Sequence, residues 1–85
     1  MVEFKQFIGQ TVEVTFINAV VFKGTSIRKV VGKLESGAFP GVGVLIEIQS
    51  TEDTTGNDVA ERIGLKGMGM VFNTGNIEFI IGPTK

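Results

Sequence analysis

The chain has 85 residues and a mass of 9.1 kDa, which suffices for one small domain and excludes a two-domain enzyme. It contains no cysteine and no histidine, so disulfides, zinc ribbons, thiol nucleophiles and imidazole bases are excluded. Eight Lys and Arg against nine Asp and Glu give a formal net charge of −1, so nucleic-acid binding would need a local basic patch. Composition therefore predicts a single folded domain over residues 1–85, with no cofactor and no metal.

The first residues predict a short amphipathic helix. Phe4, Phe7 and Ile8 follow helical spacing, and Gly9 stands where a terminating glycine is expected. We expect a helix over about Val2 to Ile8 that packs its apolar stripe on the domain. No signal-peptide pattern is present and no stretch approaches the roughly 20 apolar residues that span a bilayer. The chain is therefore expected to be cytoplasmic, with no membrane partner.

Alternation with period two begins directly after this helix. Residues 11–16 alternate apolar and polar side chains, which is typical of a half-buried strand. Residues 18–19 give a weak turn signal, and residues 20–31 predict a long second strand. Gly24 lies inside that strand and indicates a bend, a bulge or a close approach of backbone. Residues 33–41 contain several breakers and predict the first substantial loop.

The second half of the chain predicts three more strands. Residues 42–49 form the clearest strand pattern, whereas residues 50–62 are polar and predict a solvated loop or hairpin tip. Residues 63–72 alternate glycine with apolar residues and predict a strongly curved fourth strand. After a tight turn, residues 77–81 predict the last strand. The fold class expected is all-β: a small, strongly bent, five-stranded antiparallel barrel of the Sm-like or SH3-like kind with a short N-terminal helix.

Two segments resemble the motifs of one family of small barrels. Residues 12–27 are similar to the first Sm motif of the Sm/LSm RNA-binding family, with Gly24 at the place of the glycine in the bent second strand. Residues 67–80 are similar to the second Sm motif, in which a strand, a glycine-containing turn and an apolar strand follow one another. The resemblance implies a ring-forming scaffold that binds RNA or single-stranded nucleic acid, with a role in RNA or DNA processing or chaperoning.

The chain departs from the family at the positions that bind the base. The family usually places an aspartate and an asparagine in the loop after the second strand, and residues 29–41 contain neither. It also places an arginine before the turn glycine of the second motif, where this chain has Thr74 before Gly75. The resemblance therefore does not carry over the uridine pocket of the family.

Four residues are the predicted nucleic-acid site. Lys33 would neutralise a phosphate, Phe39 would stack on a base, and Asn73 and Asn76 would read base edges. The alternative is that the cations lie on a solvated strand face and that Phe39 anchors its loop in the core. The acidic side chains of residues 50–62 lack the spacing of a calcium loop and an apolar setting for acid and base catalysis, so no enzyme activity is predicted.

The last strand predicts an assembly. Residues 77–81 carry apolar side chains on both faces, and an apolar edge strand left open invites pairing. Pairing with the fourth strand of a second copy would build a homo-oligomeric ring. The alternative is a monomer in which this strand closes its own barrel. A second candidate function is a non-catalytic protein-interaction or structural assembly module without nucleic-acid binding, which the acidic pI of about 5.3 favours.

Overall fold

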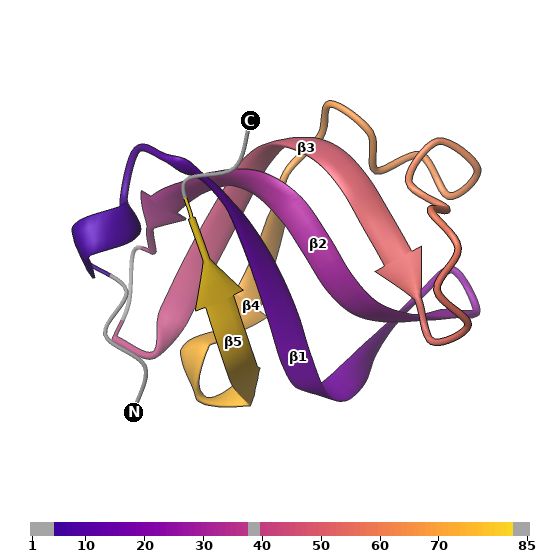
Figure 1. The fold of residues 1–85 in the computed structure, drawn as a ribbon, viewed down its shortest axis with the longest axis horizontal. Coiled ribbons are helices and arrows are strands. Elements are labelled where there is room, and N and C mark those ends of the chain that lie inside the picture. Colours follow the sequence, from indigo (N-terminus) through magenta and orange to yellow (C-terminus); the bar gives the residue numbers. More distant parts are fainter. Residues whose placement is uncertain (1–4, 38–39, 83–85) are drawn as a thin grey trace.

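The structure is a computed structural model that describes residues 5–37 and 40–82. Five antiparallel strands form one sheet in the order β4-β3-β2-β1-β5, and the sheet curls around a single core as a half-barrel (Figure 1). The predicted all-β class and the strongly bent five-stranded sheet are confirmed. The elements are η1 (Lys5–Phe7), β1 (Thr11–Phe22), β2 (Thr25–Ser36), β3 (Val42–Asp53), β4 (Met70–Asn73), η2 (Thr74–Asn76) and β5 (Ile77–Ile81).

The described part of the predicted N-terminal helix is a single 3₁₀ turn, η1, and residues 1–4 lie outside the described residues. Gly9 follows η1 with a positive φ of 87°, as expected for a terminating glycine. Its N–H donates to the Leu34 carbonyl at 2.7 Å, and the Leu34 N–H donates to the Gln10 carbonyl at 2.9 Å. These bonds draw the chain into the sheet after one turn, and Phe7 packs against the core.

The first hairpin turns later than predicted. The chain reverses at Lys23 and Gly24, which have φ values of 51° and 76° and connect the paired residues Phe22 and Thr25. Two successive positive φ values are the signature of a type I′ turn, which suits the twist of a hairpin. Gly24 is therefore a turn glycine and not a bend inside a strand. The turn predicted at residues 18–19 is wrong, because β1 continues through them.

A large bulge in β1 explains the misleading signal at residues 18–19. Between the pairs Thr15↔Lys29 and Val20↔Ile27, β1 has the four residues 16–19 whereas β2 has only Arg28. The extra residues on one strand remove regular cross-strand partners and bend the ribbon. The turn residues of the sequence thus mark a kink in a continuous strand.

The second bend lies where β2 crosses β3. A Cβ at Gly32 would approach the Ile46 carbonyl oxygen to 3.1 Å, so the glycine allows the two backbones to come close. The register of β2 against β3 shifts between Val31 and Lys33, and opposite this point Glu47 has a φ of 50°. β2 extends to Ser36, so the predicted loop over residues 33–41 is shorter than expected and Lys33 belongs to the strand.

The predicted fourth strand over residues 63–72 is wrong over most of its length, because β4 begins only at Met70. Val59, Ile63 and Leu65 are buried in the core by a turn of helical character, in which the Ile63 N–H donates to the Val59 carbonyl at 3.0 Å. Apolar residues separated by four positions share one face of a helical turn. In the sequence alone, a short run of apolar residues like this one is compatible with a strand as well as with a helical turn.

This helical turn has a defined beginning and end. The Asp58 Oδ1 accepts a hydrogen bond from the Ala60 N–H at 3.1 Å, as an N-cap residue does. Gly64 has a φ of 76°, and after it the Leu65 N–H donates to the Ala60 carbonyl at 2.8 Å. That return bond is part of a Schellman motif, which ends a helix at a glycine.

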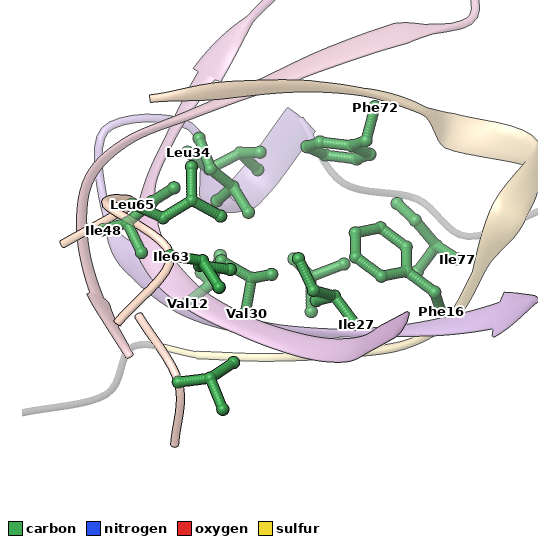
Figure 2. Packing of buried hydrophobic residues seen from close by; sticks show 13 residues of the cluster. Val12, Phe16, Ile27, Val30, Leu34, Ile48, Ile63, Leu65, Phe72 and Ile77 are labelled. Atoms are coloured by element: carbon green, nitrogen blue, oxygen red, sulfur yellow. The ribbon is translucent and has the colours of Figure 1, made fainter. Parts of the chain in front are cut away.

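The core lies inside the curl of the sheet, where the labelled side chains of Figure 2 point toward one another. Phe16 of β1 and Phe72 of β4 meet edge to face with ring centroids 5.9 Å apart. Phe72 also lies over Gly43 on the neighbouring strand, where a Cβ would come within 2.5 Å of its Cζ atom. The glycine therefore makes room for the ring through which the edge strand β4 contacts β1 across the core.

Candidate nucleic-acid interface

One end of the half-barrel is formed by η2 and the neighbouring end of the β2 to β3 connection, and we call it the rim. The Thr74 N–H donates to the Gly41 carbonyl at 2.9 Å, which holds the two segments together. Val42 and Asn73 form the adjacent strand pair. The connections that follow β2 and β4, far apart in the sequence, thus lie side by side at this end.

Asn73 is the last residue of β4 and caps η2. Its backbone is extended, with φ −82° and ψ 122°, and its Oδ1 accepts a hydrogen bond from the Gly75 N–H at 2.8 Å. An asparagine oxygen satisfies a free N–H of the first turn in this way. The residue is exposed. Its Nδ2 group has no hydrogen-bond partner among the described residues and is available to a ligand.

Asn76, the second predicted base-reading amide, is occupied within the fold. Its Oδ1 accepts from the Asn18 N–H at 2.9 Å, and its Nδ2 donates to the Asn18 carbonyl at 2.9 Å. Asn18 lies in β1 beyond its last pair with β5, Phe16↔Ile77, so this amide serves as the partner of the Asn18 backbone on the β5 side. Asn76 therefore positions η2 against β1, and reading a base would require these two bonds to open.

A shallow pocket of about 410 Å³ opens beside these side chains, and we call it the asparagine pocket. It is lined by Asn18, Ala19, Asn73, Gly75 and Asn76. Asn73 and Asn76 are predicted site residues, whereas the third asparagine of the pocket, Asn18, is not predicted from the sequence. The turn signal at residues 18–19 marked the right place, but it gave no reason to join that place to the second motif.

The other two predicted site residues, Lys33 and Phe39, are not among the described residues that line this pocket. Lys33 lies within β2 opposite Ile46, and its Nζ is 4.0 Å from Glu35 Oε1. It is not among the residues that line the asparagine pocket. Phe39 lies outside the described residues. The structure thus brings Asn73 and Asn76 together and leaves Lys33 on the face of the sheet.

Cations on the sheet are paired with carboxylates. Arg28 is 3.2 Å from Glu78, and Lys29 is 3.9 Å from Glu13. Each pair is partly exposed, so it adds little to stability, but it compensates the positive charge. Together with Lys33 and its partner, these pairs leave no concentrated basic patch on the described faces of β1 and β2.

The acidic connection after β3 uses its carboxylates to hold its own backbone. Asp53 Oδ1 accepts hydrogen bonds from the Thr55 hydroxyl at 2.6 Å, the Thr55 N–H at 2.9 Å and the Asn57 N–H at 3.0 Å. These bonds, with that of the Thr55 hydroxyl the strongest contribution, lower the pKa of Asp53 below its ordinary value. Within residues 5–37 and 40–82, no group of three His, Cys, Asp or Glu side chains is arranged to hold a metal ion.

Comparison with protein-family models, with curated proteins and with solved structures gave no significant match. In the described part of the chain, no helix has the length and apolar character needed to cross a membrane.

Proposed function

We propose that this chain is an Sm-like subunit that assembles head to tail into a homo-oligomeric ring and binds RNA or single-stranded nucleic acid at the rim without catalysing a reaction. The observation that carries the proposal is the sheet order, which leaves β4 at one edge and β5 at the other. A head-to-tail interface needs two different edges of this kind on one protomer. The cytoplasmic location predicted from the sequence stays part of this proposal.

Both edges expose apolar side chains that a neighbour would cover. Val71 of β4 is 66% exposed, and Phe79 and Ile81 of β5 are 58% and 56% exposed. No strand among the described residues pairs with the outer side of β4 or β5. Open apolar edges are a hazard to an isolated subunit. Pairing β5 of one copy with β4 of the next would bury these residues and satisfy the free backbone groups.

An apolar pocket next to the β4 edge supports the same interface. It has a volume of about 240 Å³ and is lined by residues that include Phe22, Ile27, Leu65, Met70 and Val71. It lies between the far end of β1 and β4, where the half-barrel is open. A side chain from a strand added to β4 would have an apolar place to enter.

Two features support nucleic-acid binding at the rim: the polar groups of the rim, and the repetition of the rim in every subunit of a ring. The Nδ2 group of Asn73 makes no hydrogen bond to any residue that the structure describes, and the rim joins two segments that a ring would repeat once per subunit. Weak contacts repeated around a ring combine into a higher overall affinity. Each single site can therefore be weak.

A second candidate function, an assembly module without nucleic-acid binding, is favoured by the paired cations. Lys33, the predicted phosphate contact, is 4.0 Å from Glu35, and Arg28 is 3.2 Å from Glu78. Phosphate contacts supply most non-specific affinity for nucleic acid, so compensated charges weaken it. The ring would then serve as a surface for contacts with other proteins and would not bind nucleic acid.

Light scattering coupled to gel filtration tests the ring. We expect the wild-type chain to elute at a multiple of 9.1 kDa, and Val71→Arg and Phe79→Arg to shift it to the single-chain mass. Thr54→Arg is the control, because Thr54 is exposed in the connection after β3 and lies neither on an outer strand nor in the lining of the apolar pocket. A wild-type species of 9.1 kDa, or equal effects of all three variants, would contradict the ring.

Fluorescence anisotropy with labelled oligo-U, oligo-A and single-stranded DNA tests binding at low and moderate salt. Asn73→Ser should weaken binding without loss of stability, since serine keeps an acceptor for the N-cap but removes the Nδ2 donor. Lys33→Gln tests the phosphate contact against Lys66→Gln, which removes an exposed lysine from the segment between β3 and β4. If no oligonucleotide binds at low salt, the assembly module is the correct function.

A further inference from the structure

The bulge of β1 turns a third asparagine into the asparagine pocket. Regular pairing with β2 stops after Thr15 and resumes at Val20, so the backbone of Asn18 has no strand partner on that side. Bulges often redirect a side chain at a functional site. Here the Asn76 amide holds the Asn18 backbone from the opposite side with two bonds of 2.9 Å. The backbone of Asn18 is therefore fixed while its own side chain stays exposed.

The side chain of Asn18 has its full hydrogen-bonding capacity. Among the described residues, neither its Oδ1 nor its Nδ2 has a hydrogen-bond partner. An amide presents one donor and one acceptor side by side. In the same pocket, Asn73 adds a free Nδ2 donor, and the small residues Ala19 and Gly75 leave the surface between the asparagines open. The pocket thus offers one complete amide and one additional donor.

None of the described residues that line the pocket is charged, which determines the kind of group that fits it. A phosphate is recognised by cations or by clustered N–H groups, and this pocket supplies neither. A planar base edge with a neighbouring donor and acceptor matches an amide directly. Asparagine pairs in this bidentate way with the N6 and N7 atoms of adenine. Uracil also presents a donor beside an acceptor in a single strand, and we choose adenine because its N6 and N7 atoms are the usual partners of asparagine. Adenine then keeps a further ring nitrogen as an acceptor for the Asn73 Nδ2 group.

We propose that Asn18 is the residue that determines base preference in this pocket: it pairs bidentately with a single unstacked adenine, while Asn73 donates to the same base. This inference rests on the proposed nucleic-acid binding and adds to it the preferred base and the residue that selects it. Single-stranded nucleic acid is the expected form, because the base must leave its stack to present these edges.

Binding of oligo-A and oligo-U of equal length is compared for the wild type, Asn18→Ala and the control Gln49→Ala, which removes an exposed amide from β3. We expect the wild type to prefer oligo-A. Asn18→Ala should lower the affinity for oligo-A by roughly 5- to 150-fold, the range of one bidentate base contact, and leave the affinity for oligo-U nearly unchanged. Gln49→Ala should change neither.

Thermal unfolding is measured to check that Asn18→Ala is folded, which we expect because the two bonds from Asn76 go to the backbone of residue 18 and do not need its side chain. Asn18→Ser serves as a second variant if alanine unfolds the chain. Equal losses for oligo-A and oligo-U, or no loss, would overturn the role of Asn18 while the proposed function stands. Absence of any binding by the wild type would overturn both.

Discussion

Replacing Gly43 by alanine would place a methyl group against the ring of Phe72. The added Cβ would lie 2.5 Å from Cζ and 2.8 Å from Cε2, whereas carbon atoms in contact are about 3.5–4.0 Å apart. The ring must therefore move by about 1 Å. Phe72 is only 5% exposed and packs edge to face on Phe16, so it has little freedom to do so. We expect a loss of about 1–3 kcal/mol in the free energy of unfolding, as for other overpacked cores.

The sign of this effect makes it a sharp test. Without a clash, alanine in a strand is more stable than glycine by roughly 0.5–1 kcal/mol. We expect Gly43→Ala to become neutral or stabilising in a Phe72→Leu background, measured by urea unfolding at one fixed protein concentration. A loss below about 0.5 kcal/mol in the wild-type background, or the same loss in both backgrounds, would show that the ring does not lie against Gly43.

Three further predictions concern the turns and the core. Lys23→Asn should raise the free energy of unfolding by up to about 1 kcal/mol, because asparagine tolerates the positive φ of this turn position; an unchanged urea midpoint would contradict the type I′ turn. Thr51→Val should stabilise by about 1 kcal/mol, since the buried Thr51 hydroxyl has no hydrogen-bond partner in the described part of the chain, and a lower midpoint would show that the hydroxyl is hydrogen-bonded. The pKa of Asp53 is lower in the folded state than in the unfolded state, so the ionised carboxylate stabilises the fold. This stabilisation is present above the unfolded pKa of about 3.9 and is lost as pH falls through the folded pKa. The stability difference between the wild type and Asp53→Asn should therefore shrink below about pH 4, and a constant difference would contradict the lowered pKa.

The sequence predicted the class of the fold because alternation survives wherever one face of a strand is buried. Residues 42–49 and 77–81 lie within β3 and β5, and Val12, Val14 and Phe16 are fully buried as expected. The ends of the strands were harder to predict. Residues 20–22 suit a strand equally well before or after a turn, and only the pairing of the folded chain places the reversal at Lys23.

The candidate site was only partly predictable for a related reason. Asn73 and Asn76 were found from the turn between the last two strands, but the occupation of Asn76 depends on Asn18, which is 58 positions away. Lys33 was assigned to a loop because the breakers nearby begin at Gly37, whereas β2 continues to Ser36. Long-range pairing and strand register are not visible in a local pattern of residues.

Three residues, Thr74–Asn76, separate β4 from β5, so one short turn relates the two outer edges of the sheet. In the proposed assembly, the angle between these edges becomes the rotation from one copy to the next. A closed circle requires that rotation to divide a full revolution into equal steps, and any other angle yields a helical filament. Subunit number is then encoded in the geometry of this connection, and adding or removing one residue there would alter the stoichiometry.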